Sequence, residues 1–294
     1  DSDIVIHLKL DNDNSLIEKI SEQIKHKISS EFNGYEIKIK ILEFSSPVST
    51  QIQNLGNIKK IIAIASGKGG VGKSTTTINI ASILSEKFKV GILDLDIYGP
   101  SLSMALNCYE SPKMNSKNQL IPIEKYGMKL MSFGFLNSEK STTIWRGPMV
   151  SRMTQQFFEH VDWGELDYLL LDLPPGTGDI QLTLVQKIAL SGAIIVTTPQ
   201  DLAILDVTKA SDMFRKLKTP IIGVIENMSG ILFSGYVYDD HGNKINGSIK
   251  MKNDTYLVED GKFSIEMKLF KGSGGQNESK RLDVPFLATI PMDP

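Results

Sequence analysis

From position 61 the chain reads Ile61-Ile62-Ala63-Ile64-Ala65-Ser66-Gly67-Lys68-Gly69-Gly70-Val71-Gly72-Lys73-Ser74-Thr75. A short apolar run is followed at once by a glycine-rich loop that matches the pattern G-x-x-x-x-G-K-[ST]. We expect a helix over residues 74–87, directly after the loop. This stretch therefore predicts a buried strand, a phosphate-binding loop and a helix, in that order.

The loop has the groups that a nucleoside triphosphate requires. Glycines let the backbone wrap closely around phosphate oxygens, and the loop amides and the helix N-terminus present positive dipoles to them. We expect Lys73 to reach the β- and γ-phosphates and the Ser74 hydroxyl to ligate Mg²⁺. The predicted nucleotide contacts are Gly67, Lys68, Gly69, Gly70, Val71, Gly72, Lys73, Ser74 and Thr75. A glycine-rich turn without a ligand is disfavoured, because the Lys-Ser pair and the strand–helix context occur together.

The rest of the chain from Lys59 alternates short apolar runs with helical stretches. Nearly continuous apolar runs are typical of strands that are buried on both faces of a parallel sheet. The alternation predicts a doubly wound α/β domain over residues 59–294. The expected strands are 61–65, 90–95, 168–173, 193–197, 220–225 and 286–290, and the expected helices are 74–87, 148–160, 179–190 and 201–217.

Carboxylates follow two of these strands, where ligands of such sheets bind. Asp172 ends one apolar run, and we assign it to Mg²⁺ through a water molecule. Asp96 follows another run, and we expect it near Mg²⁺ and the attacking water. Asp94 is the weaker candidate, which braces either Lys73 or a loop. Gly176, in the Pro-Pro-Gly-Thr-Gly segment after Asp172, is predicted to sense the γ-phosphate.

Three residues near later strand ends are candidates for contact with the nucleotide base. Asn227 follows the expected strand 220–225, and its amide could read an adenine edge. Pro291 and Asp293 lie just past the last expected strand. An asparagine after a strand is also an ordinary turn residue, so the residues alone leave this assignment open.

Two segments break the alternating pattern. Residues 1–44 read strand–helix–strand, which predicts part of a small α+β domain, and residues 45–58 look like a linker. Residues 234–271 contain no obvious helix but several alternating stretches separated by turn signals at Asp240-His241-Gly242-Asn243 and Asp260-Gly261. They predict two β-hairpins inserted before the last strand.

Composition excludes several classes of function. The 294 residues have a formal net charge of −2, so we expect no nucleic-acid partner. No apolar run approaches the ~20 residues of a membrane-spanning helix. Cys108 is the single cysteine, which favours a reducing compartment: the cytoplasm, or an organelle matrix if an upstream segment has been removed.

Several longer motifs resemble the Mrp family, P-loop ATPases of iron–sulfur cluster assembly that are also called ApbC-type carriers. The resemblance runs from about Lys59 to Pro294, apart from the insert. Its motifs are the loop with its extra lysine, Asp94-Leu95-Asp96-Ile97-Tyr98-Gly99-Pro100-Ser101, Trp145-Arg146-Gly147-Pro148, Asp172-Leu173-Pro174-Pro175-Gly176-Thr177-Gly178-Asp179, Glu226-Asn227-Met228-Ser229 and Val284-Pro285-Phe286-Leu287.

The resemblance implies a homodimer that hydrolyses ATP with Mg²⁺ near the subunit interface. The deviant loop with Lys68 is shared with MinD, ParA and the nitrogenase iron protein. It implies that Lys68 acts in trans on the partner's nucleotide, so that Lys68, Lys73, Asp96 and Asp172 are the expected catalytic residues. It also implies iron–sulfur apoproteins or assembly factors as partners.

One departure from the family concerns the iron–sulfur cluster. The family usually places Cys-x-x-Cys shortly after Glu-Asn-Met-Ser, but here Ser229 is followed by Gly230-Ile231-Leu232-Phe233-Ser234-Gly235. Imidazole from His241 or carboxylate from Asp239 and Asp240 are poor substitutes for thiolates at a soft iron–sulfur core. We therefore expect an intact ATPase with weak or absent cluster binding.

Two other functions remain open from the sequence. One is a MinD/ParA-like positioning switch, which would require an amphipathic helix or a basic surface that the sequence does not show. The other is a nucleotide-gated scaffold that uses the hairpins as a partner surface.

Overall fold

The structure is a computed structural model that describes residues 3–10, 22–25, 27, 36–43, 57–97, 99, 101–135, 155–251, 254–270 and 272–293. The chain divides into two compact units, Asp1–Thr50 and Gln51–Pro294. The boundary between them falls inside the segment 45–58 that we predict as a linker.

The smaller unit contains a pair of parallel strands. β1 (Asp3–Leu10) pairs with β2 (Glu36–Glu43) from Asp3↔Glu36 to Leu10↔Glu43. Residues 22–25 and 27, which lie between them in the sequence, are helical, and the rest of the predicted helix lies outside the described residues. Parallel neighbours require a crossover connection, so the strand–helix–strand order fits this pairing.

The larger unit alternates strands and helices. Its strands are β3 (Ile58–Ala65), β4 (Val90–Asp94), β5 (Lys113–Met114), β6 (Leu120–Ile121), β7 (Ile123–Lys125), β8 (Met128–Ser132), β9 (Leu166–Asp172), β10 (Gly192–Thr197), β11 (Ile221–Tyr236), β12 (Gly247–Met251), β13 (Asp254–Val258), β14 (Lys262–Met267) and β15 (Phe286–Met292). Its helices are α2 (Lys73–Ser85), α3 (Leu102–Ala105), α5 (Asp179–Lys187), α6 (Asp201–Lys216) and α7 (Gly274–Leu282), with a 3₁₀ turn, η1 (Phe133–Phe135). Residues 155–159 are also helical, whereas 148–154 of that predicted helix lie outside the described residues.

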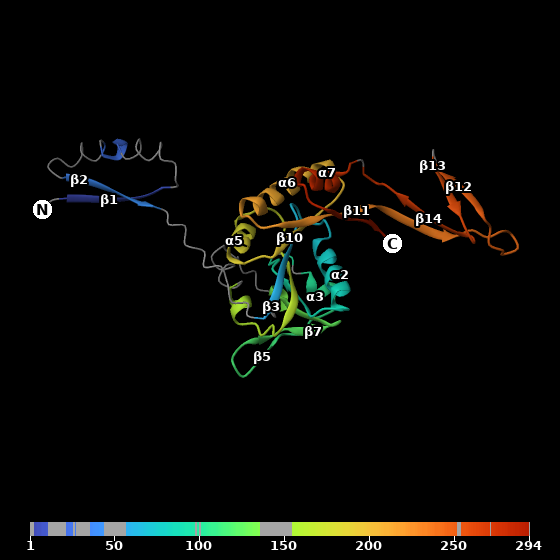
Figure 1. Cartoon of the computed structure of the whole chain (residues 1–294), viewed down its shortest axis with the longest axis horizontal. Helices are drawn as coiled ribbons and strands as arrows, with labels where there is room; N and C mark the ends of the chain where they lie inside the picture. The colour runs from blue at the N-terminus through green and yellow to red at the C-terminus, as the bar shows by residue number, and fades with distance from the viewer. Residues whose placement is uncertain are drawn as a thin grey trace. The chain divides into compact units, whose positions relative to one another are not determined.

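The main sheet is mostly parallel, which confirms the predicted fold. Its strand order is β14-β11-β10-β3-β9-β4-β8-β7, and β15 also pairs with β11. The pairs that join β11, β10, β3, β9, β4 and β8 in this order are parallel, and so is the pair of β11 with β15. The strands β14 and β7, at the two ends of the order, pair antiparallel with β11 and β8. β3 lies between β10 and β9 in this order, away from both ends of the sheet (Figure 1). The loop that follows β3 therefore emerges at the middle of the sheet.

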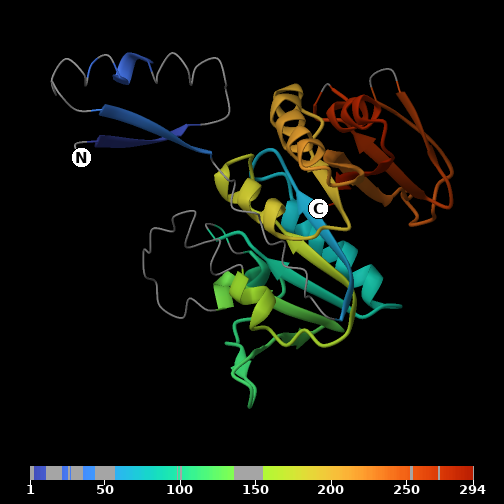
Figure 2. The same cartoon turned by 60° about the vertical axis from the view of Figure 1, so that its left-hand side comes forward.

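Helices cover both faces of the sheet, which explains why the strands are apolar throughout. In β9, Leu169 and Leu171 belong to a core cluster that includes Leu184 of α5 and Phe214 of α6. Leu170, between them, belongs to a second cluster with residues of α2 and α3. Figure 2 shows α2 and α5 on opposite sides of β3. Because successive strand residues point to opposite faces, both faces need apolar side chains.

The insert differs from its prediction. The expected strand 220–225 continues as β11 to Tyr236, with a register break between Asn227 and Ile231. The first part of β11 pairs with β10 and β15, and the second pairs antiparallel with β14. We call residues 231–270 the arm; in Figure 1 it extends away from the sheet and carries the antiparallel hairpin β12–β13. The insert is thus an extension of a core strand.

Helix α7 is absent from the sequence-based expectations. It begins at Gly274-Gly275, and its buried positions are Gly274, Gly275, Glu278 and Ser279. A helix whose buried face is polar or glycine gives no apolar periodicity. The last strand also runs further than predicted, to Met292 in β15.

Candidate nucleotide site

The phosphate loop connects the central strand to helix α2. β3 ends at Ala65, and α2 begins at Lys73 with Gly72 as its N-cap. Gly70 and Gly72 have φ values of 77° and 78°, which glycine adopts at no steric cost. The loop therefore has the strand–loop–helix placement that the motif requires.

The loop glycines serve two different purposes. A Cβ at Gly67 would lie 2.2 Å from the backbone of Asp206 in α6, and one at Gly72 would lie 2.2 Å from Asn227 Nδ2. A Cβ at Gly70 would meet no atom within 4 Å, and the nearest at Gly69 is Pro175 Cγ at 3.8 Å. Packing thus requires glycine at positions 67 and 72. Gly69 and Gly70 instead lie on the exposed side that a phosphate would approach.

Asp172 is the centre of the site. Lys73 Nζ donates to Asp172 Oδ1 at 2.6 Å, Thr77 Oγ1 donates to the same oxygen at 3.1 Å, and Ser74 Oγ donates to Oδ2. Lys73 and Asp172 are 6% and 2% exposed. The structure thus brings three of the predicted residues together. Sequence analysis missed Thr77; its place one helical turn after Lys73 was the available signal.

Asp94 and Asp96 occupy different environments after β4. Asp94 is fully buried: its Oδ1 accepts the Asp96 N–H at 3.0 Å, and its Oδ2 accepts Ser132 Oγ–H at 3.0 Å. Burial, and then the charge of Asp172, raises the pKa of Asp94 to about 7. Asp96 is partly exposed and accepts the Gly99 N–H at 3.2 Å. Of the alternatives for Asp94, its hydrogen bonds favour bracing the loop that carries Asp96.

Lys68, within the loop, and Gly176, after β9, each hydrogen-bond to a neighbouring segment. Lys68 Nζ donates to Gln200 Oε1 at 3.1 Å, directly before α6. The Gly176 N–H donates to Ser66 O at 3.0 Å, and Gly176 has a φ of 95°. The segment after Asp172 is therefore hydrogen-bonded to the start of the phosphate loop. Gln200 was not among the predicted residues.

The residues predicted to contact the base lie on adjacent strands. Asn227 lies within β11, not after it, and its Nδ2 donates to Val71 O at 2.9 Å. Pro291 lies within β15, and Asp293 follows that strand. Ile290 of β15 pairs with Asn227. The strand positions predicted for Asn227 and Pro291 were thus wrong by a few residues, but the pairing brings all three to one region.

The oxygen donors at Asp172 suit Mg²⁺. Mg²⁺ at a nucleotide site takes one or two carboxylates together with substrate phosphates and waters. The Ser74 hydroxyl and the Asp172 carboxylate already adjoin. The described residues contain no group of three or more His, Cys, Asp or Glu side chains placed to hold a metal ion, so a cage made by the protein alone is not the expected form. Ser74 and Asp172 would hold the ion. Asp96 lies two residues after Asp94, which pairs with Asp172 across β4 and β9.

The single cysteine and one of the carboxylates considered as a poor substitute for thiolate are both engaged within the fold. Cys108 is 2% exposed and lies in the core cluster with Leu102 and Leu106. Asp239 accepts the N–H groups of His241 and Asn243, and these bonds form a turn. Of these described residues, Cys108 is packed in the core and Asp239 is engaged in a turn, so neither is placed as a cluster ligand.

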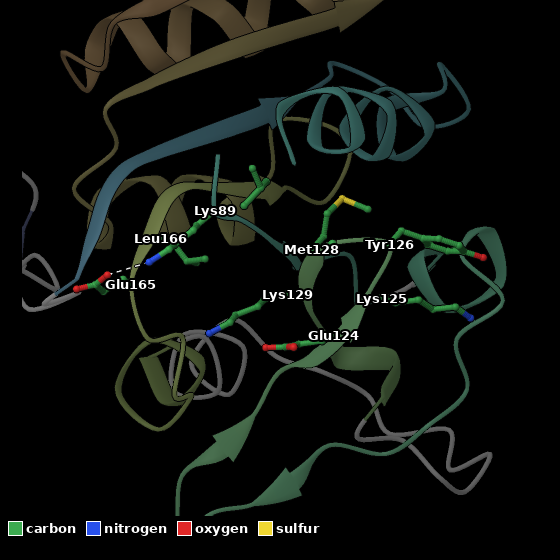
Figure 3. Close-up of a pocket in the computed structure, with 10 residues that line it drawn as sticks. Lys89, Glu124, Lys125, Tyr126, Met128, Lys129, Glu165 and Leu166 are labelled. Carbon is green, nitrogen blue, oxygen red and sulfur yellow. Dashed lines mark hydrogen bonds and ion pairs between the residues drawn. The ribbon is translucent and has the colours of Figure 1, made fainter. Parts of the chain in front are cut away.

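A second hollow lies at the opposite edge of the sheet. A pocket of about 520 Å³ is lined by the first residues of β4, β8 and β9. Figure 3 shows these lining side chains. Lys89 in this pocket pairs with Glu165 at 3.0 Å, and Lys129 Nζ donates to Trp163 O at 2.8 Å. These cations are already paired, and the pocket is remote from the carboxyl ends of the strands.

In the described part of the chain, no helix has the length and apolar character of a membrane span.

Comparison with known proteins agrees with this geometry. The family described as "ParA: NUBPL iron-transfer P-loop NTPase" matches residues 57–244. An iron-sulfur cluster carrier protein from Pseudomonas fragi is 47% identical over 260 residues, which cover 87% of this chain and 81% of the relative. The iron-sulfur cluster transfer protein NUBPL from Dictyostelium discoideum is 42% identical over 238 residues, 80% of this chain and 65% of the relative, so the chain spans less than two thirds of that protein.

A solved structure is similar over most of the chain. The nucleotide-binding protein from Archaeoglobus fulgidus in complex with ADP has a TM-score of 0.62 and 33% identity, covering 83% of this chain and 87% of its own. The family match covers more than half of the chain, and its residues include the whole phosphate loop and the carboxylates that follow β4 and β9. The chain therefore belongs to the NUBPL iron-transfer family of P-loop NTPases.

Proposed function

We propose that the chain binds ATP with Mg²⁺ at the phosphate loop and hydrolyses it. The observation that carries this proposal is the convergence of Lys73 and Ser74 on the buried carboxylate of Asp172. The loop amides and the Lys73 ammonium would hold the β- and γ-phosphates. Mg²⁺, when bound, supplies charge neutralisation at the phosphates. Asp96, held by Asp94 at its peptide N–H, is the candidate for orienting the attacking water.

Removing the charge of Lys73 tests this proposal. Lys73→Ala should abolish phosphate release from ATP and greatly weaken ATP binding, because the loop loses its main cation. Lys89→Ala is the matched control, since Lys89 lies at the opposite edge of the sheet and pairs with Glu165. Normal turnover by Lys73→Ala would contradict the assignment of the site.

We infer that the active form is a homodimer in which Lys68 contacts the partner's nucleotide. Lys68 belongs to the deviant loop, and within one chain its Nζ reaches Gln200 rather than the acidic side chains of the site. Lys68→Ala should keep ATP binding but lose hydrolysis. A wild-type chain that stays monomeric with ATP and Mg²⁺, by light scattering, and still turns over would contradict the role in trans.

We further propose that the protein acts with iron–sulfur apoproteins or assembly factors as a nucleotide-switched scaffold, in the cytoplasm or an organelle matrix. Support comes from the relatives whose names describe cluster carriage and transfer. The chain itself should hold a cluster weakly or not at all, because its one cysteine is buried in the core.

Anaerobic reconstitution with iron and sulfide tests the last point. We expect little iron and sulfide to remain with the protein after gel filtration. A stoichiometric cluster that disappears in Cys108→Ala would show that Cys108 is a ligand. A cluster that persists in that variant would require ligands not recognised here.

A further inference from the structure

Buried polar atoms without partners gather at one edge of the sheet. In the part of the chain that the structure describes, the buried side-chain atoms without a hydrogen bond are Ser101 Oγ, Thr198 Oγ1, and both Nε2 and Oε1 of Gln181. These residues follow β4, β10 and β9, so they all lie toward the carboxyl ends of the strands. Gln181 stands out because both ends of its amide are unpaired.

Gln181 occupies a position where an apolar side chain is expected. It is 1% exposed, and it shares the buried face of α5 with Leu184 and Val185, three and four residues further along the helix. A buried amide without partners lowers the stability of the fold, so each such group in a native structure calls for an explanation, such as a functional role. A methionine of similar length would fill the same space without this cost.

The segment before α5 is in contact with the phosphate loop. The Gly176 N–H donates to Ser66 O, and Pro175 lies against Gly69. A Cβ built at Gly176 or Gly178 would meet no atom within 4 Å, so space is available on this side. Residues 174–178 are thus positioned to move relative to the loop without a clash at these two glycines.

Gln181 is the third residue of α5, which gives its amide a specific partner. The N-cap of α5 is Gly178, and it has no side-chain cap. A glutamine at this third position can reach back to the backbone N–H of the N-cap residue. That hydrogen bond is absent in the conformation that the structure describes, although both groups belong to the same helical turn.

We propose that Gln181 is a positioning residue for ATP hydrolysis, whose amide pairs with the backbone of residues 176–178 when this segment closes on the γ-phosphate. The closed conformation then gains hydrogen bonds that the described conformation lacks. ATP favours closure because its γ-phosphate binds the closed conformation more tightly than the described one. This inference rests on the proposed ATPase function. It assigns to Gln181 a role in closure, not contact with the reacting atoms.

The substitution Gln181→Met separates stability from turnover. Without nucleotide, the variant should melt at the same temperature as the wild type or higher, because an unpaired buried amide is removed. With ATP and Mg²⁺, kcat should fall about tenfold, with a smaller change in KM. The extra melting shift that ATP gives over ADP should also shrink. Gln186→Met, an exposed position on the same helix, is the control and should change none of these.

A second variant and an exchange measurement complete the test. Gln181→Glu keeps an acceptor for the Gly178 N–H and should retain more turnover than Gln181→Met. Hydrogen exchange at the backbone amides of residues 176–182 should slow with ATP in the wild type but less so in Gln181→Met. Wild-type turnover in Gln181→Met, or lower stability without nucleotide, would overturn the proposal. An inactive wild-type chain would instead overturn the proposed ATPase function, and this inference with it.

Discussion

The phosphate-loop edge and the arm are connected by strand β11 but use opposite chemistry. At the loop edge, charged and polar side chains are buried and hydrogen-bonded to one another, as Lys73, Thr77 and Asp172 show. In the arm, large apolar side chains are exposed, including Phe233 and Tyr236 of β11 and Leu257 of β13. The carboxylate of Asp239 in the arm accepts the Asn243 N–H within a turn and does not pair with a charged group among the described residues.

This difference indicates that the phosphate-loop edge carries the chemistry, whereas the arm extends the fold. A buried ion pair persists only where its partners are fixed, which is the condition for a site prepared to receive phosphates. The arm is connected to the phosphate-loop edge through β11. Asn227 Nδ2 donates a hydrogen bond to Val71 O in the loop, and the arm begins four residues after Asn227. Changes at the loop edge should therefore alter both stability and turnover, whereas changes in the arm should leave turnover intact.

The largest effect is expected from Asp172→Ala. The change leaves the Lys73 ammonium buried without its carboxylate. The free energy of unfolding should therefore fall by about 4 kcal/mol. Turnover should fall by at least ~100-fold, because Lys73 and Ser74 lose their common partner. Urea denaturation and phosphate release measure the two effects. Asp239→Ala in the arm is the control and should keep turnover; equal losses in both variants would contradict the contrast.

Two glycines with nearly identical φ angles sharpen the comparison. Gly72 and Gly242 have φ values of 78° and 80°, but a Cβ at Gly72 would strike Asn227 Nδ2, whereas one at Gly242 meets nothing within 4 Å. Gly242→Ala should cost only the backbone strain, ~1 kcal/mol. Gly72→Ala should cost more and weaken ATP binding at least ~10-fold, because it displaces Asn227. Thermal melting and nucleotide titration distinguish them; similar behaviour of both would refute the packing argument.

Arg281→Ala tests the link between α7 and α6. Arg281 donates to Glu278 at 2.8 Å and to Asp212 at 3.0 Å, and Glu278 is buried. The substitution should cost about 2 kcal/mol at neutral pH, because a buried carboxylate loses charged hydrogen bonds. Lys280→Ala, an exposed neighbour on α7, is the control.

The same variant has a predicted pH dependence. Burial raises the pKa of Glu278, but hydrogen bonds from Arg281 and Ser211 outweigh it and hold the pKa below its ordinary 4.5. A lowered carboxyl pKa contributes stability that is present above about pH 4.5 and is lost as the pH falls through the folded-state pKa. The difference in stability between wild type and Arg281→Ala should therefore shrink below that pH. A constant difference would contradict the pairing.

The smallest effect on catalysis should come from shortening the arm. Tyr236 and Lys262 are the last paired residues of β11 and β14, so residues 237–261 can be replaced by an Asn-Gly turn that closes the ribbon. ATP turnover should stay within about twofold of the intact chain, because distant sites contribute independently. A matched chain with only Tyr236→Ala is the control. A large loss of turnover after shortening would show that the arm takes part in catalysis.

The sequence by itself determined the phosphate loop, the parallel sheet and the position of Asp172. These features follow from local patterns: a glycine-rich motif at fixed spacing, continuous apolar runs, and a carboxylate at the end of one run. Parallel strands bring their carboxyl ends to one edge, so local patterns were sufficient to place Asp172 near Lys73.

Only the tertiary structure decided the partners of groups that lie far apart in the chain. The bond from Asn227 to Val71 spans 156 positions, and the continuation of β11 into the arm depends on pairing with β14. Helix α7 was missed because its buried face is glycine and Glu278 rather than apolar side chains. The unpaired amide of Gln181 likewise has no sequence signal, because a glutamine on a helix is ordinarily exposed. Local periodicity reports which face of an element is apolar, whereas hydrogen-bond partners depend on how distant elements pack.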